Sequence, residues 1–147
     1  MESEGSCLPL RVDAPPDPKR IQGITAFALA LHDRDYIRQV CEHIKSFGYN
    51  TLRVGFETWR WEDWGYLSHG PKFDSAENLR NVWRLLDETA RIEGIWVELI
   101  PVFTIKGLEN PDTPEMRRKA VELAAGLVAD NDFKHAYLSY ANEWSHS

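Results

Sequence analysis

Residues 34–56 read RDYIRQVCEHIKSFGYNTLRVGF, a helical pattern followed directly by a strand pattern. The helix is predicted to begin after the cap Asp33 and to stop at Gly48, because apolar side chains recur at helical spacing between them, at Ile37, Val40, Cys41, Ile44 and Phe47. Asn50–Phe56 is short and largely apolar, which predicts a strand. A helix that leads straight into a buried strand indicates an α/β protein.

Three further apolar segments predict strands elsewhere in the chain, at Ile21–Leu31, Ile95–Phe103 and His135–Ala141. The first of them is nearly continuous, as in a parallel strand that is buried on both faces. The segments between the four predicted strands are each long enough for a right-handed crossover helix.

Two more helices are predicted in these connections. Asp74 with Glu77 fits a capping box, and Thr113 followed by Pro114 fits an N-cap with proline at the first helical position. The order is therefore βαβαβαβ, with parallel strands in the order 1-2-3-4 and helices on the outer face only.

Two architectures fit this order, namely a small doubly wound sheet and the first half of a (β/α)8 TIM barrel. The first strand is followed by His32-Asp33-Arg34 instead of a glycine-rich loop, which argues against a nucleotide-binding doubly wound sheet. We expect a proline-rich lead-in over residues 1–20 and a half-barrel over residues 21–147.

The composition excludes several classes of protein. The chain has 147 residues, enough for one domain, and 17 Lys and Arg against 23 Asp and Glu give a net charge of −6. Without a basic block, neither nucleic acid nor a membrane is expected as a partner. Cys7, Cys41 and the five histidines lack metal-ligand spacing, so no metal or cofactor is expected. No signal peptide and no membrane-spanning run is recognised, so we expect a soluble chain, cytoplasmic by default.

Polar and aromatic residues follow each predicted strand, where α/β folds bind their ligands. They are His32 and Asp33 after the first strand, Glu57, Trp59, Trp61, Glu62, Asp63, Trp64 and Tyr66 after the second, Thr104 and Lys106 after the third, and Asn142, Glu143 and Trp144 after the fourth. Aromatic rings stack on the apolar faces of sugars, while carboxylates and amides bind the hydroxyl groups. This set predicts a sugar site.

The end of the fourth strand carries the most specific motif. Ala141-Asn142-Glu143-Trp144 resembles the Asn-Glu signature of the clan A glycoside hydrolases, the superfamily of (β/α)8 cellulases, mannanases and β-galactosidases. Gly48-Tyr49-Asn50-Thr51-Leu52-Arg53 is similar to the clan's second strand, where a Gly-x-Asn-x-x-Arg run brings an arginine to the active site. Residues 90–102 are similar to the third unit, although Pro101-Val102-Phe103 stands where members often carry a histidine. The resemblance covers residues 21–144.

The resemblance implies retaining hydrolysis of a β-linked glucan, mannan or related glycan. By position, Glu143 is the general acid/base, Asn142 holds the sugar 2-hydroxyl, and Arg53 orients and ionises the nucleophilic carboxylate. Substrate contacts are assigned to the aromatic residues Trp59, Trp61, Trp64, Tyr66 and Trp144.

The clan's nucleophile comes from a seventh strand, which this sequence lacks. We therefore expect the isolated chain to be inactive, with its open sheet covered by a second barrel half or by another subunit. An open sheet also leaves two unpaired edges, which invites association.

Other interpretations stay open for each residue. Glu143 also fits a surface carboxylate or a helix cap, and Arg53 fits a partner for Glu98 on the neighbouring strand. The aromatic cluster also fits the packed core of a loop. For the whole chain, the main alternative is a non-catalytic carbohydrate-binding or structural module in a larger assembly, and a third is a doubly wound sheet with an unrelated ligand.

Overall fold

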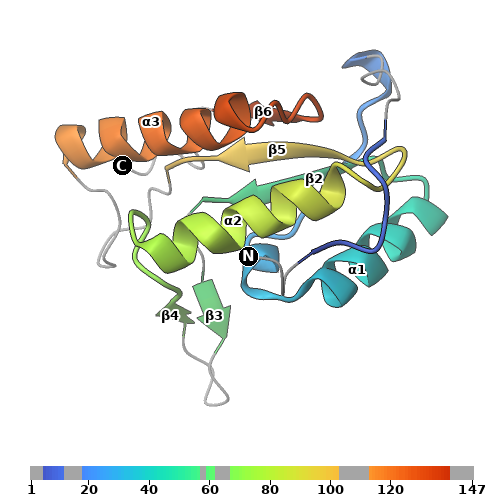
Figure 1. Ribbon diagram of the computed structural model, residues 1–147, viewed down its shortest axis with the longest axis horizontal. Helices are drawn as coiled ribbons and strands as arrows, with labels where there is room; N and C mark the ends of the chain where they lie inside the picture. The colour runs from blue at the N-terminus through green and yellow to red at the C-terminus, as the bar shows by residue number, and fades with distance from the viewer. Residues whose placement is uncertain (1–4, 12–17, 57–58, 62–66, 103–112, 140–147) are drawn as a thin grey trace.

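The computed structural model describes residues 5–11, 18–56, 59–61, 67–102 and 113–139. In this part of the chain a parallel sheet has the order β1-β2-β5-β6, and its strands are β1 (Gly23–Thr25), β2 (Thr51–Gly55), β5 (Trp96–Ile100) and β6 (Ala136–Leu138) (Figure 1). The helices that alternate with them are α1 (Arg34–Ser46), α2 (Ala76–Thr89) and α3 (Pro114–Asp130). The predicted α/β fold, with parallel strands paired in chain order, is confirmed.

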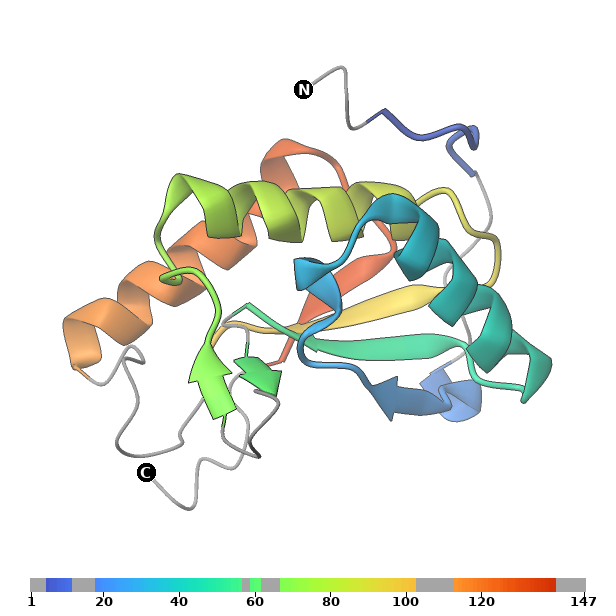
Figure 2. The same ribbon diagram turned by 90° about the horizontal axis from the view of Figure 1, so that it is seen from below.

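The hydrophobic core lies between these helices and one face of the sheet (Figure 2). Because side chains alternate along a strand, one face of β2 and β5 presents Leu52, Val54, Val97 and Leu99, all of which are buried. The same core takes side chains from every one of the described α-helices, including Ile37 and Cys41 of α1, Val82, Leu85 and Leu86 of α2, and Ala120 and Ala124 of α3. The other face of β2 and β5 carries the partly buried Arg53 and Glu98 at its centre.

A network of charged side chains joins α1 to α2. Arg34 Nη1 lies 2.7 Å from Asp87 Oδ2 and 3.0 Å from Glu88 Oε2. Arg38 binds Glu88 at 3.2 Å, and Arg91 binds Asp87 at 3.1 Å. Glu88 is fully buried, so its carboxylate requires these cationic partners.

The ends of α1 follow the predicted signals. The Asp33 side chain accepts a hydrogen bond from the Tyr36 amide at 2.9 Å. Gly48 has a φ of +88°, which L side chains rarely adopt, and its amide donates to the Lys45 carbonyl at 2.9 Å. Phe47 shares the apolar spacing of the helix, but it is the C-cap residue and its side chain is 68% exposed.

The cap of α2 lies one residue later than predicted. Ser75, not Asp74, accepts a hydrogen bond from the amide of Asn78, at 3.1 Å. Asp74 instead forms an ion pair with Lys119 at 2.8 Å, and this hydrogen bond lowers the pKa of Asp74.

The first strand is much shorter than the predicted Ile21–Leu31. β1 covers Gly23–Thr25 at the edge of the sheet, where all its residues are exposed, so it is not buried on both faces. Leu29–Leu31 forms a 3-10 helix instead, in which Leu29 and Ala30 are buried. These apolar residues are buried because the 3-10 helix packs against α2. Arg84 of α2 donates a hydrogen bond to the Ala30 carbonyl at 3.1 Å.

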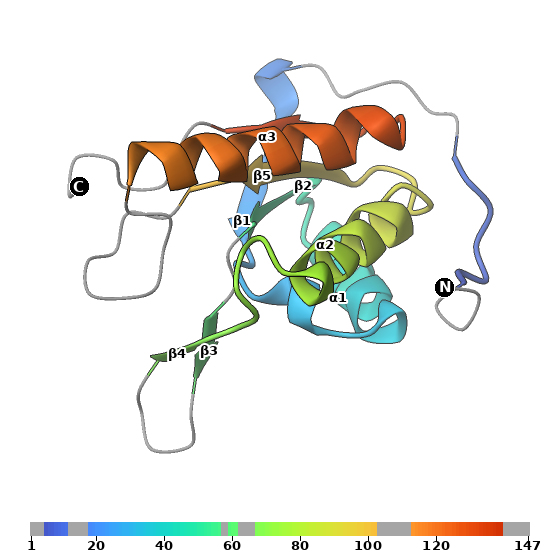
Figure 3. The ribbon, with the colours of Figure 1, turned by 60° about the vertical axis from the view of Figure 1, so that its left-hand side comes forward.

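Two segments outside the main sheet bear on the site. β3 (Trp59–Trp61) and β4 (Leu67–His69) form an antiparallel pair in the region predicted as a loop, and this pair projects past the carboxyl end of β2 (Figure 3). At the other end, the amino-terminal segment packs against the end of α2. Arg91 donates to the Leu8 carbonyl at 2.8 Å, and the Arg11 guanidinium donates to the carbonyls of Ile92 and Ile95.

Candidate functional site

The sheet face opposite the helices carries a row of polar residues. Thr25 is in register with Arg53, Arg53 with Glu98, and Glu98 with Tyr137, so the row crosses all the strands of the described parallel sheet. These positions alternate with the buried core positions of β2 and β5, which places them on the other face. The sheet therefore gathers a cation, an anion, a hydroxyl and a phenol across its middle.

The centre of this row is an ion pair. Arg53 Nε lies 3.5 Å from Glu98 Oε1, and the two side chains are 33% and 23% exposed. The predicted pairing of these residues is confirmed. The Arg53 guanidinium also lies 6.0 Å from the centre of the Phe27 ring, in the segment that follows β1. Arg53 is thus held by a side chain of β5 and by one from the segment after β1, and it stays partly exposed.

Tyr137 extends the site onto β6, and no sequence motif marks this residue. Its partial burial and the negative charge of Glu98 raise the pKa of the Tyr137 phenol. Tyr137 is 40% exposed, and its phenol is a hydrogen-bond donor at ordinary pH. The position of Tyr137 in the sequence does not predict that it belongs to the site, because its register with Glu98 is set only once β5 and β6 pair.

Asn78 fixes the carboxyl end of β2, and sequence patterns also missed it. Its fully buried amide donates to the Phe56 carbonyl at 2.8 Å and to the Phe73 carbonyl at 2.9 Å. Phe56 in turn donates its amide to the Ile100 carbonyl at 2.8 Å. These bonds tie the start of α2 to the point where the chain leaves β2 for β3.

The predicted site residues fall in different parts of the chain. Arg53 lies at the centre of the polar row, and Trp59 and Trp61 lie in β3, in register with His69 and Leu67. The others lie outside the described residues: Trp64, Tyr66, Asn142, Glu143 and Trp144. The first residues after β5, Pro101 and Val102, are buried.

The described residues contain neither a candidate metal-ligand group nor a membrane-spanning helix. Among them, no three His, Cys, Asp or Glu side chains are grouped so that they could hold a metal ion. No helix in this part of the chain is long and apolar enough to cross a membrane.

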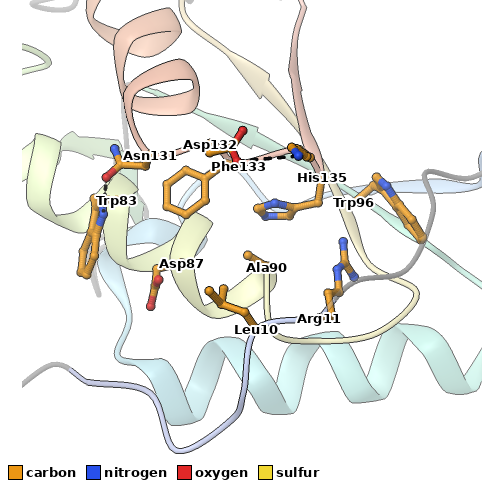
Figure 4. Close-up of a pocket in the computed structure, with 11 residues that line it drawn as sticks. Leu10, Arg11, Trp83, Asp87, Ala90, Trp96, Asn131, Asp132, Phe133 and His135 are labelled. Carbon is orange, nitrogen blue, oxygen red and sulfur yellow. Dashed lines mark hydrogen bonds and ion pairs between the residues drawn. The ribbon is translucent and has the colours of Figure 1, made fainter.

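A cavity of about 620 Å³ lies away from the predicted rim, at the amino ends of β5 and β6 (Figure 4). Trp83, Trp96, Phe133 and His135 supply its aromatic lining. No sequence pattern predicts this cavity, because its walls come from α2, from the start of β5, from the α3–β6 turn and from the amino-terminal segment.

Comparisons with known proteins support the fold. No family model matches the chain, and no curated protein matches it. Among solved structures, it is similar to the endo-1,4-beta-mannanase from Rhizomucor miehei, with a TM-score of 0.57 and 15% sequence identity. The match covers 91% of this chain and 48% of the mannanase chain, so the chain spans about half of that length. The chain has the α/β fold of part of a (β/α)8 barrel.

Proposed function

We propose that this chain is the amino-terminal half of a glycoside-hydrolase barrel and supplies the acid/base side of a retaining site for β-linked glycans. The observation that carries the proposal is the parallel order β1-β2-β5-β6 with Asn142-Glu143 shortly after β6 in the sequence. In such barrels the catalytic groups come from the carboxyl ends of the strands.

Each residue has a stated role in the reaction. Glu143 protonates the leaving oxygen and then deprotonates the attacking water, while Asn142 holds the 2-hydroxyl of the sugar. Arg53 orients a nucleophilic carboxylate and keeps it ionised, and the Glu98 carboxylate holds Arg53 in place at 3.5 Å.

The aromatic residues form the substrate platform in this proposal. Trp59, Trp61, Trp64, Tyr66 and Trp144 stack against the sugar rings of a glucan, mannan or related glycan. Support comes from the β3–β4 pair, which projects beyond β2, and from Asn78, which fixes its starting point.

The nucleophile is contributed by a complementary barrel half or another subunit. A retaining mechanism needs a second carboxylate about 5–5.5 Å from the first. Support comes from the sheet edges, since among the described strands β1 and β6 each pair on one side only. Ile24 and Leu138 on these edges are 38% and 37% exposed.

A non-catalytic carbohydrate-binding or structural module is the second candidate. It is favoured by the end of β5, where the buried Pro101 and Val102 bring no polar group to the rim in the described residues. Such a module would bind glycans and would lack turnover in every assembly.

Hydrolysis of aryl β-glycosides and β-mannan separates the two candidates. The chain alone is expected to show no turnover, because one carboxylic acid cannot form a glycosyl intermediate. A longer chain from the same gene, or a complementing barrel half, should restore activity. Glu143→Gln should then lower kcat on poor leaving groups by roughly 10²–10⁴-fold, the usual worth of general acid catalysis. Glu93→Gln, which changes an exposed carboxylate at the turn before β5, is the matched control and should retain most of the activity.

Two results would contradict the proposed glycosidase mechanism. A completed barrel that binds glycans without hydrolysing them supports the module. Hydrolysis by the isolated chain that survives Glu143→Gln removes Glu143 from the mechanism.

A further inference from the structure

The cavity at the amino ends of β5 and β6 lies at the opposite end of the sheet from the proposed glycosidase site. Its volume of about 620 Å³ is within the range of roughly 300–1,000 Å³ found for small-molecule sites. Figure 4 shows the rings of Phe133 and His135 and the side chain of Leu10 directed toward its centre. The cavity is therefore large enough for a sugar residue and has aromatic walls.

The backbone fixes the aromatic walls without a ligand. After α3, the amide of Phe133 donates to the Val128 carbonyl at 3.0 Å and that of Asp132 to the Ala129 carbonyl at 3.2 Å, which is a Schellman motif. Asp132 accordingly has a φ of 55°. This turn places Phe133 edge to face against His135, with ring centres 5.8 Å apart.

Trp83 forms the opposite wall, and its Nε1 donates to Asn131 Oδ1 at 3.3 Å (Figure 4). The Arg34 guanidinium lies 5.5 Å from the centre of the Trp83 ring. The indole is only partly buried, so its orientation is set while part of its surface stays accessible. A preset, accessible indole is a suitable stacking surface.

The charged groups of the lining have partners within the chain. Asp87 is bound by Arg34 at 2.7 Å and by Arg91 at 3.1 Å. The Arg11 guanidinium donates to backbone carbonyls and lies 4.7 Å from the centre of the Trp96 ring. Burial lowers the pKa of His135 to about 3, so its ring is neutral. No net charge is left to attract an ion into the lining formed by the described residues.

The rim of the cavity is polar and open to solvent. Asn131 is exposed, and the ion pair between Asp132 and Lys134, at 3.7 Å, is about 80% exposed on both sides. Amide, carboxylate and ammonium groups at a rim above aromatic walls suit a neutral ligand with an apolar face and a ring of hydroxyl groups.

We propose that this cavity is a second saccharide-binding site, in which one neutral sugar residue packs its C–H face against the partly exposed Trp83 and bonds its hydroxyls to Asn131, Asp132 and Lys134, while the buried rings of Phe133 and His135 form the floor. The choice of a saccharide rests on the proposed function, since that function supplies glycans as ligands. The site itself lies apart from the proposed catalytic rim and does not depend on it.

The indole N–H signals of the six tryptophans in an NMR titration test the site. The 147-residue chain is titrated with β-1,4-mannotetraose, with cellotetraose and with free indole as a neutral aromatic probe. We expect a tetraose to shift the signals of Trp83 and of the backbone amides of residues 131–135. Trp83→Ala should weaken this binding about tenfold, the loss expected for one stacking contact with its buried area.

One rim variant provides a second test of the site, and Trp61→Ala in the proposed substrate platform is the control. Asp132→Gly removes a rim carboxylate, and glycine tolerates the positive φ at that turn, so it tests the site even where Trp83→Ala fails to fold. It should weaken tetraose binding severalfold, while Trp61→Ala should leave the shifts at residues 131–135 unchanged.

Three results overturn the second site. Shifts confined to the other indoles leave the proposed function standing and remove this cavity from glycan binding. Shifts at the cavity with indole alone show an aromatic-ligand site instead of a saccharide site. The absence of shifts at residues 131–135 with any probe rejects the site, whereas hydrolysis by a completed barrel still decides the proposed function.

Discussion

Arg53 serves the fold and the proposed chemistry with the same guanidinium group. Its partner Glu98 lies on the next strand at 3.5 Å, and Tyr137 is in register beyond Glu98. A partly exposed ion pair of this kind contributes little to stability, so its main effect is to orient Arg53.

Removing the charge of Glu98 should lower the pKa of Tyr137, because the carboxylate disfavours the phenolate. Glu98→Gln should also reduce the free energy of unfolding by only about 0.2–1 kcal/mol. The tyrosinate absorbance in a pH titration, taken as the difference from a Tyr137→Phe variant, measures the shift. Glu93→Gln changes an exposed carboxylate and is the control. An unchanged Tyr137 titration in Glu98→Gln would contradict the polar row.

His135 should make the protein sensitive to mild acid. Burial and the positive charge of Arg11 lower its pKa from 6.5 to about 3, while Thr89 Oγ1 lies 2.8 Å from Nε2. Below pH 6.5 the histidine is protonated in the unfolded chain but stays neutral in the folded chain. The free energy of unfolding therefore decreases as the pH falls. Between about pH 7 and pH 5 the free energy of unfolding should decrease by at most about 2 kcal/mol.

Urea unfolding at the two pH values measures this decrease. His135→Gln should reduce the difference between the two free energies, whatever its effect on absolute stability. His43→Gln, at an exposed position of α1, should retain it. An equal pH dependence in His135→Gln would contradict the assignment.

The candidate site was predictable where residues neighbour one another on adjacent strands. Arg53 and Glu98 hold equivalent places in two apolar segments, so their pairing follows once both are recognised as parallel strands. Asn78 and Tyr137 were not predictable, because their roles depend on which carbonyls or strands lie beside them after folding. Glu143 and Asn142 lie outside the described residues, so their assignment stays a prediction.

At the scale of elements, the cap of α2 tests how a helix start is chosen. Asp74 and Ser75 are both good caps, but the Ser75 oxygen accepts from the Asn78 amide while Asp74 binds Lys119. Ser75→Ala should therefore lower the free energy of unfolding by about 1 kcal/mol. Asp74→Ala breaks a surface ion pair and should cost less. Thermal unfolding of both variants measures the difference, and a larger loss for Asp74→Ala would return the cap to that residue.

Most elements follow from local signals, and the exceptions have a common physical reason. Asp33, Gly48 and Thr113 act at helix ends as predicted. Ile21–Leu31 was predicted as one strand, because apolarity alone does not separate a strand from a buried turn of helix. The charged contacts between α1 and α2 were invisible to apolar spacing, since Glu88 is buried by its ion pairs and not by hydrophobicity.

At the scale of the whole molecule, the described sheet has one helical face and two edges. The edge residues Ile24 and Leu138 lie on the helical side, in register with Leu52 and Leu99, yet they remain exposed. In a complete (β/α)8 barrel, further strands and helices would flank both positions. Ile24 and Leu138 are therefore exposed for the same reason that the edges are unpaired: no further strand of the described sheet lies beside β1 or β6.

Association through these edges is the last prediction. The isolated chain should associate as its concentration rises, because unpaired strand edges and apolar edge residues favour pairing between chains. Light scattering across a concentration series measures this. Leu138→Lys places a charge on the β6 edge and should shift the chain toward monomer without lowering its melting temperature. Phe47→Lys changes a side chain that is more exposed but lies at the end of α1, so it should leave association unchanged. If Phe47→Lys also produces monomers, association is driven by general hydrophobicity and not by the sheet edge. If the wild-type chain is a monomer at every concentration, the reason for expecting a covering partner is removed.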